Sequence, residues 1–235
     1  MAAIFRREMS AYFNSPTAYI YLAVFNFFAG LFFTVNNLWS SPTTDMAGLF
    51  ANMFMIFLFL IPILTMRLMS EDKKQKTDQC LLTSPVSLMG IVLGKYLAAL
   101  VMFALSLITF LLYAVILAAF SPVTWAAVIG NIVGVLLTGG AFIAVGLFIS
   151  SLTESQVIAA IGGFLAMMLL YTIDMLASFI SNTTIQSVLN SLAFYSKYYE
   201  FTTGVFNFSS ILFFISAAVI FLFFTVRVLE KKRWS

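Results

Sequence analysis

Six apolar runs without a single Asp, Glu, Lys or Arg dominate the sequence, and each is 17 to 27 residues long. A run of about 18 apolar residues is long enough to cross a bilayer as a helix. Only 9% of the 235 residues are charged, against about 25% in an average soluble domain. The sequence therefore predicts an all-α integral membrane protein with six transmembrane helices. The predicted spans are residues 18–35, 46–66, 96–120, 123–149, 157–173 and 210–226.

The spans and their short connections take up nearly all of residues 1–235, which leaves no room for a soluble domain of about 50 residues. We therefore expect a single membrane domain. Residues 2–13 place most of their apolar side chains on one side of a helical wheel, with Arg6 and Arg7 on the other. This pattern predicts a helix that lies in the membrane interface. The turn signal before Pro16 lets the chain bend from that helix into the membrane.

Basic residues are concentrated in three places along the chain. Eleven of the twelve Lys and Arg residues lie near the N-terminus, in the charged segment 67–95 or after residue 226, and only Lys197 lies elsewhere. An even number of spans puts these three places on one side of the membrane, and basic residues collect in cytoplasmic loops. We therefore predict a protein of the cytoplasmic (inner) membrane whose termini and 67–95 loop are cytoplasmic. This placement explains the net charge of +3 without a nucleic-acid partner.

The segment between the fifth and sixth spans, residues 174–209, is rich in Tyr and Phe and carries few charges. Aromatic side chains with sparse charges are typical of interfacial or re-entrant segments. We predict that this outer segment re-enters the membrane. Asp174 stands at the outer end of the fifth span, where a solvated carboxylate is the expected state.

The residues that the chain lacks exclude several kinds of chemistry. It has no histidine and a single cysteine, Cys80, so histidine-based catalysis, a paired-histidine metal site and an internal disulfide are unavailable. The span cores carry no ionisable side chain, which argues against ion coupling. Residues 90–96 resemble a phosphate-binding loop only superficially, because three residues separate the glycines and Tyr96 follows Lys95. We expect no catalytic residue, metal or cofactor on this chain.

Glycines stand at helix-contact spacing in two spans. Gly130 and Gly134 are four residues apart in the fourth span, and Gly162 and Gly163 are adjacent in the fifth. Small residues let helices approach closely in lipid. The pattern favours ordinary bundle packing over the alternative, a helix interface that moves.

Four segments together resemble the permeases of type 2 ABC exporters, and the resemblance is closest to the gliding-motility-type branch. Residues 67–86 with 91–95 resemble the signature after the second span, and residues 195–204 resemble the outer segment before the last span. Residues 225–234 resemble the family's tail. Residues 5–8 with 12–16 resemble its opening elbow helix, whose matching residues here are Phe5, Arg6, Arg7 and Glu8.

The resemblance implies a dimer of six-helix subunits, each of which grips an ATP-binding cassette ATPase subunit through a short coupling helix between spans two and three. ATP and magnesium would then bind on the partner ATPase. The second permease subunit could be identical or related, and an auxiliary membrane protein with an extracytoplasmic domain is a further partner. Lys76 stands where the family commonly has glycine. The residues implied in ATPase contact are Glu71, Asp72, Thr77, Asp78, Leu81, Leu82, Thr83, Ser84 and Pro85.

Two other interpretations of the charged segment and of the whole chain stay open. The 67–95 segment could be a solvated hairpin whose lysines only obey charge topology or touch anionic lipid. The chain could be a membrane anchor or mechanical component of an ABC-type complex that moves no solute, or an ATP-independent carrier. Few polar groups lie in the spans, which would suit a lipid-like or peptide substrate.

Overall fold

The computed structural model describes residues 1–39, 43–77, 79, 86–179, 186, 189, 191–204 and 207–234, without the side chains of residues 177, 178 and 234. Over these residues the fold is helical and contains no strand. Six continuous helical segments are long and apolar enough to cross a membrane. The prediction of an all-α membrane protein with six transmembrane helices is therefore confirmed.

The helices differ in length and role. In chain order they are α1 Ala2–Phe13, α2 Pro16–Phe33, η1 Thr34–Trp39, α3 Ala47–Thr65, α4 Arg67–Lys74, α6 Leu88–Ala118, α7 Trp125–Leu152, α8 Gln156–Phe179, α10 Phe194–Thr202 and α11 Phe208–Trp234. Here η1 is a π-helical continuation of α2, and α4 continues α3 after one residue. The six membrane-crossing segments are α2 with η1, α3 with α4, and α6, α7, α8 and α11, and each overlaps one predicted span.

The segment predicted to connect the second and third spans, residues 67–95, is helical at both of its ends. Its first eight residues form α4 and its last eight form the start of α6. Ser87 explains where α6 begins, since its Oγ accepts a hydrogen bond of 3.2 Å from the Gly90 amide and so satisfies a free N–H of the first turn. With 31 residues, α6 is about 46 Å long and exceeds the hydrocarbon core of about 30 Å.

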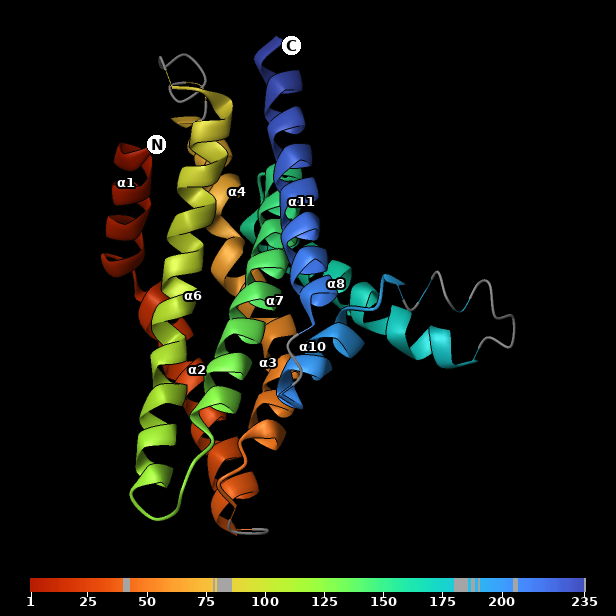
Figure 1. The fold of residues 1–235 in the computed structure, drawn as a ribbon. Coiled ribbons are helices and arrows are strands. Elements are labelled where there is room, and N and C mark those ends of the chain that lie inside the picture. Colours follow the sequence, from red (N-terminus) through yellow and green to blue (C-terminus); the bar gives the residue numbers. More distant parts are fainter. Residues whose placement is uncertain are drawn as a thin grey trace.

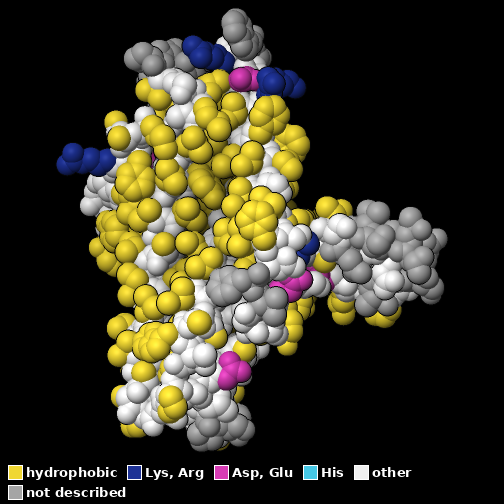
Figure 2. Space-filling model, viewed as in Figure 1, with side chains coloured by type: hydrophobic (Ala, Val, Ile, Leu, Met, Phe, Trp, Pro, Cys, Tyr) yellow, Lys and Arg dark blue, Asp and Glu magenta, His cyan; other side chains and the backbone are white. Residues whose placement is uncertain are grey.

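Both chain termini lie at the same end of the bundle, which we call the terminal end (Figure 1). The end of α4 and the start of α6 lie there too, and α1 runs alongside the first turns of α6 (Figure 1). Hydrophobic side chains cover the side of the bundle, whereas most of the visible Lys and Arg side chains lie toward the terminal end (Figure 2). This distribution is that of a protein whose sides face lipid.

Helix α7 is the centre of the bundle and contacts α3, α4, α6, α8, α10 and α11. Glycines on α7 permit this, because a Cβ at Gly134, Gly139 or Gly146 would lie within 2.5 Å of a side-chain atom on a neighbouring helix. The atoms that such a Cβ would meet belong to Phe201 of α10, Phe103 of α6 and Thr65 of α3. One helix thus lets three others approach closely.

Candidate functional site

Helix α4 is a charged helix at the terminal end and follows directly on the second membrane span. Pro62 lies in the last turn of α3, and the chain passes through Met66 into α4. After α4 the backbone turns at Lys76, whose φ of 58° is left-handed. Glycine adopts this conformation without strain, and here the turn forms with lysine. The helix therefore breaks before Thr77 although lysine stands in place of the family's glycine.

A buried cluster of charges joins α4 to α1 and α6, and we call Arg7, Glu8, Asp72 and Lys95 the anchor cluster. The ammonium of Lys95, a residue only 1% exposed, lies 2.8 Å from Glu8 Oε1 and 2.6 Å from Asp72 Oδ2. It also donates a hydrogen bond of 2.5 Å to the carbonyl of Leu68. Arg7 Nη2 lies 2.5 Å from Asp72 Oδ1. Each buried charge in the cluster is thus paired, which a low-dielectric site requires.

Helix α1 contributes to the anchor cluster because one of the residues on its buried face, Glu8, is charged. Ile4, Glu8 and Tyr12 are buried at spacings of four residues, so they share one face. Ile4 packs against Gly94 of α6, and the Tyr12 hydroxyl donates a hydrogen bond of 2.8 Å to the carbonyl of Leu64. Glu8 lies between them and meets Lys95. This face fixes α1 to the bundle.

The other side of α4 is attached to the end of α7. Ser150 Oγ accepts hydrogen bonds of 3.2 Å from the amides of Met69 and Ser70, and it donates one of 2.9 Å to the carbonyl of Met66. Lys73 Nζ donates to the carbonyl of Ser151. The first turn of a helix has free N–H groups, and here a serine from another helix accepts two of them. Helix α4 is therefore held on two sides by different helices.

Arg67 attaches the start of α4 to the bend between α1 and α2. Its guanidinium donates hydrogen bonds of 2.6 Å to Ser15 Oγ and 3.2 Å to Thr17 Oγ1 and lies 5.6 Å from the Tyr12 ring centre. It also pairs with Glu71 at 3.0 Å. A cavity of about 210 Å³ lies among these groups and the anchor cluster. Its lining carries as many carboxylates as basic side chains, so it favours neither sign of charge.

The structure brings three of the sequence-predicted contact residues together. Asp72 is buried in the anchor cluster, Thr77 donates a hydrogen bond of 2.9 Å to Asp72 Oδ1, and Glu71 pairs with Arg67. The others lie outside the described residues, namely Asp78, Leu81, Leu82, Thr83, Ser84 and Pro85. Of the elbow residues, Phe5 packs against the core, Arg6 is exposed, and Arg7 and Glu8 join the anchor cluster.

Sequence reasoning missed Lys95 and Ser150. The sequence places Lys95 at the end of the charged segment 67–95, but in the structure it is a single charge within an apolar stretch that begins at Leu88. A lone ionisable residue in such a stretch is the signal that could have found it. Lys73, which the open hairpin interpretation leaves solvated, instead donates to a backbone carbonyl of α7. Ser150 gave no signal, because serine is common at helix ends.

The glycines singled out from the sequence lie at helix contacts. Gly130 is buried, and a Cβ on Gly134 would overlap Phe201 of α10. A Cβ on Gly162 would lie 3.0 Å from Ile149 Cγ2, and one on Gly163 would lie 3.4 Å from Pro62 Cβ. The described contacts are those of packed helices.

Asp174, which the sequence places at the outer end of the fifth span, is half-buried and caps a helix. Its two oxygens accept hydrogen bonds of 3.0 Å and 2.9 Å from the amides of Tyr195 and Ser196, the first residues of α10 after Phe194. A carboxylate is favoured at a helix N-terminus, where N–H groups are free. The Tyr198 hydroxyl donates to the carbonyl of Phe50 at 2.6 Å, so α10 is also attached to α3.

A known protein family matches the part of the chain that contains the anchor cluster. The model of the family described as ABC-2 type transporter matches residues 1–174. The match covers about three quarters of the chain and includes α1, α4, the anchor cluster and Ser150. No curated protein matches the chain.

Proposed function

Because the chain belongs to the ABC-2 type transporter family, we propose that it is the permease subunit of an ATP-driven exporter. Membership makes it a membrane-spanning transport subunit and not an enzyme. ATP and magnesium then bind to a separate ATPase subunit, which docks on the connection between α4 and α6. The permease works as a dimer with a second copy or a related chain.

The two-sided attachment of α4 is the observation that supports coupling to an ATPase. A force applied to the chain between α4 and α6 acts on α4, which the anchor cluster holds to α1 and α6 and Ser150 holds to α7. Movement of α4 must therefore move both sets of helices or break buried ion pairs and hydrogen bonds. Buried polar contacts of this kind have few alternative arrangements, so they transmit a displacement.

The coupling contact itself is proposed for Leu81 and Leu82. These are the largest aliphatic side chains between the charged residues and Pro85. An apolar anchor at the centre of an interface commonly costs about 1 to 2 kcal/mol of binding when truncated, whereas charges at its rim cost less. Glu71 lies in α4 and Thr77 lies three residues after the end of α4, and both would contribute at the rim.

The test is the double substitution Leu81→Ala with Leu82→Ala, in the permease co-expressed with its ATPase. We expect the protein to insert and dimerise normally while it loses most of the co-purified ATPase, or keeps it with ATP hydrolysis uncoupled from transport. Lys74→Ala is the matched control, because Lys74 is exposed at the end of α4, where this connection begins. Full complex formation with fully coupled hydrolysis in the leucine double variant would show that this segment does not couple the two subunits.

The substrate is proposed to be lipid-like or a peptide, because the spans offer few polar groups. Six polar residues of the spans are candidates to meet a substrate, and of these Ser106, Asn131 and Thr138 are buried, Thr109 is half-buried, and Asn26 and Asn52 are exposed. Buried polar residues serve helix packing, so only the exposed ones remain to meet a substrate. Mass spectrometry of small molecules retained by the purified complex would identify the substrate class, and a retained small hydrophilic ion would contradict this proposal.

A further inference from the structure

Helix α10 lies deep in the bundle, beside the middle of α7. The Phe194 ring at its start stacks on Phe142 with the ring centres 5.5 Å apart, and Phe201 near its end lies against Gly134. Gly134 stands nine residues and Phe142 seventeen residues after Trp125, where α7 begins. At about 1.5 Å per residue, the two contacts lie about 14 Å and about 25 Å from that end of α7.

Both contacts fall within the hydrocarbon core, wherever α7 stands in the membrane. The 28 residues of α7 are about 42 Å long, whereas the core is about 30 Å thick. A core of about 30 Å inside a helix of about 42 Å starts at most about 12 Å from its first residue and ends at least about 30 Å from it. Positions at about 14 Å and about 25 Å satisfy both limits, so α10 lies at membrane depth.

One face of α10 is polar, although it lies at this depth. We call it the polar face, and its exposed or half-buried members are Ser196, Lys197, Tyr199, Glu200 and Thr203. The membrane-crossing helices differ, because most of their exposed positions carry large apolar side chains, such as Ile215 and Val219 of α11 and Ile161 and Leu165 of α8. Lipid suits those apolar surfaces and does not suit the polar face.

Two members of the polar face are ionisable. The Lys197 ammonium lies 5.0 Å from the centre of the Phe213 ring, and Glu200 Oε2 accepts a hydrogen bond of 2.6 Å from Ser210 Oγ. Among the described residues, no ion pair joins Lys197 or Glu200 to an opposite charge. Charged side chains are also visible at this level, part-way along the bundle (Figure 2). An ionised group in hydrocarbon is costly, and lysine reaches the interface only from near the end of a span.

The backbone that follows α10 is open as well. Gly204 is exposed and has a φ of 79°, and its amide donates a hydrogen bond of 3.1 Å to the Phe201 carbonyl. A Cβ added to Gly204 would meet no described neighbour within 4 Å. Irregular backbone occurs at membrane depth only where protein buries it or where it lines a water-filled cavity. The open space around Gly204 favours water.

The space beside α10 extends toward the end of the bundle opposite the termini. Figure 1 shows that α8 and α11 reach only to about the level of α10, whereas α2, α3, α6 and α7 continue past it. In the space-filling view the described surface narrows beyond this level (Figure 2). The described chain therefore leaves a recess on this side of the bundle, with α10 at its inner limit.

We propose that this recess is a water-filled vestibule that opens to the outer face of the membrane, with the polar face of α10 as its floor. A second wall must keep lipid out, and the second permease subunit supplies it, so this step rests on the proposed function. A transported molecule then meets water from α10 outward. Its polar part need not cross the outer half of the bilayer.

The first test measures cysteine reactivity in intact cells. Tyr199→Cys is made in the full chain with Cys80 replaced by serine, and a membrane-impermeant methanethiosulfonate carrying a trimethylammonium group is added outside. Only the thiolate reacts, and apolar surroundings suppress it, so we expect this cysteine to react at least about tenfold faster than the control below.

Ile108→Cys on α6 is the matched control. Ile108 is 49% exposed and Tyr199 is 48% exposed. Phe103 of α6 lies against Gly139 of α7, and Ile108 stands five residues further toward the opposite end, at the level of Gly134. The two cysteines thus share depth and exposure, and they differ in the polarity of the surface around them.

Three outcomes of this test would overturn the vestibule. Equal rates for the two cysteines would show that α10 is no wetter than a lipid-facing helix. No reaction at position 199 would show that lipid or protein covers the polar face, and reaction only after permeabilisation would show that the space opens to the cytoplasm. If Tyr199→Cys does not fold, Thr203→Cys at the end of α10 repeats the measurement, because Thr203 is exposed on the same face.

The second test identifies what surrounds α10 in the purified protein in lipid nanodiscs. A nitroxide on each cysteine reports collisions with a water-soluble nickel complex and with oxygen, which concentrates in hydrocarbon. We expect nickel to dominate at position 199 and oxygen at position 108. Oxygen dominating at 199 would show lipid there, and access of neither would show protein, and both results overturn the proposal. Neither test uses the ATPase, so a failure of coupling in the leucine double variant would leave these results unchanged.

Discussion

Lys95 is a buried cation whose charge is shared between two carboxylates from different helices. Glu8 and Asp72 each lie within 3 Å of its ammonium, and the Leu68 carbonyl accepts a further hydrogen bond. Replacing Lys95 by Met would leave two buried carboxylates, and only Asp72 would keep a basic partner in Arg7. Removing one partner of a buried pair costs about 3 to 5 kcal/mol. We expect Lys95→Met to lower the free energy of unfolding by about that amount, measured by denaturant titration in detergent.

The control for Lys95 is Arg7, which pairs with the same Asp72. The Arg7 side chain is 47% exposed, so water screens its charge and its loss is tolerated. Exposed pairs contribute about 0 to 1 kcal/mol. Arg7→Met is therefore expected to change stability by less than about 1 kcal/mol. If Lys95→Met and Arg7→Met lower the free energy of unfolding by similar amounts, burial does not determine how much an ion pair of the cluster stabilises the protein.

Lys76 and Lys74 allow a test in which the same substitution has opposite effects. Lys76 has a φ of 58°, where a side chain is strained and glycine is not. Lys76→Gly is therefore expected to stabilise the protein by up to about 1 kcal/mol. Lys74 lies in the last turn of α4, where glycine is unfavourable. Lys74→Gly is therefore expected to destabilise the protein by about 0.5 to 1 kcal/mol. The stabilities of the two variants are compared by thermal unfolding in detergent. If both substitutions raise stability, or both lower it, the left-handed turn at Lys76 is contradicted.

At the residue scale the sequence predicted polar groups but not their partners. Asp72 and Thr77 were identified as contact residues, and the structure shows them bonded to each other. The partner Lys95 lies 23 positions further along, and Glu8 lies 64 positions before Asp72. Pairing over such distances depends on how the helices pack, which no local pattern records.

Among the elements, α7 shows how a single helix can carry the packing of a membrane bundle. A Cβ on Gly146 would lie 2.2 Å from Thr65 Oγ1 and 2.9 Å from its Cβ. Thr65 is β-branched, and its hydroxyl donates to the Ile61 carbonyl, so it cannot move aside. We expect Gly146→Ala to cost about 1 to 3 kcal/mol, as overpacking does, and to loosen the contact between α3 and α7.

Gly163 is the matched control for Gly146. A Cβ there would lie 3.4 Å from Pro62 Cβ, which is ordinary van der Waals contact. Alanine also favours a helix interior by about 1 kcal/mol over glycine. Gly163→Ala should therefore be neutral or stabilising in the same unfolding experiment. A destabilised Gly163→Ala, or an unaffected Gly146→Ala, would contradict the described helix contacts.

The sequence predicted a helix wherever a long apolar run determines that it forms. It did not predict a helix whose start depends on a cap from a distant residue. Uninterrupted apolar runs predicted all six membrane-crossing helices. Their bounds differ most around residues 67–95, because polar residues there are helical and paired. α10 was not predicted as a helix, since its N-terminus depends on Asp174 from α8. A cap supplied from 20 residues away leaves no signature beside the helix that it starts.

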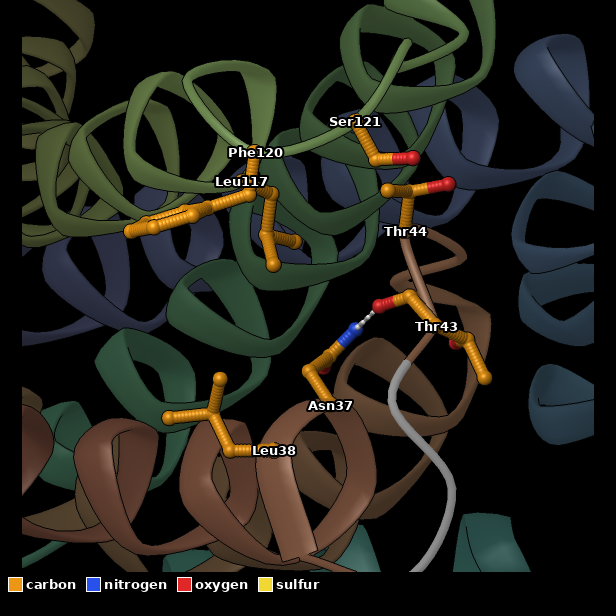
Figure 3. Close-up of a pocket in the computed structure, with 7 residues that line it drawn as sticks. All are labelled: Asn37, Leu38, Thr43, Thr44, Leu117, Phe120 and Ser121. Carbon is orange, nitrogen blue, oxygen red and sulfur yellow. Dashed lines mark hydrogen bonds between the residues drawn. The ribbon is translucent and has the colours of Figure 1, made fainter.

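At the scale of the whole molecule, the arrangement separates two ends with different chemistry. The terminal end carries paired charges on α1, α4 and α6, whereas the opposite end holds a cavity lined by Asn37 and by the α6–α7 hairpin (Figure 3). An even number of spans explains why both termini share one end (Figure 1). Sequence alone predicted that arrangement, because it needs only a count of spans. The sides of the bundle expose large apolar residues that only lipid or another membrane subunit can cover.

The basic residues predict on which side of the membrane the terminal end lies, and this prediction can be tested directly. Eleven of the twelve Lys and Arg residues belong to segments at that end, and basic residues are retained in the cytoplasm. Cys80, the native cysteine, is first replaced by serine, and single cysteines are placed at Lys74, Arg233 and Thr43. All three positions are exposed, so labelling reports the side of the membrane and not burial.

In intact cells a membrane-impermeant maleimide is expected to label position 43 and not positions 74 and 233. After permeabilisation all three should react, which shows that each cysteine is accessible. Labelling at 74 in intact cells would reverse the orientation, and it would also place the proposed ATPase contact on the side of the membrane that has no ATP.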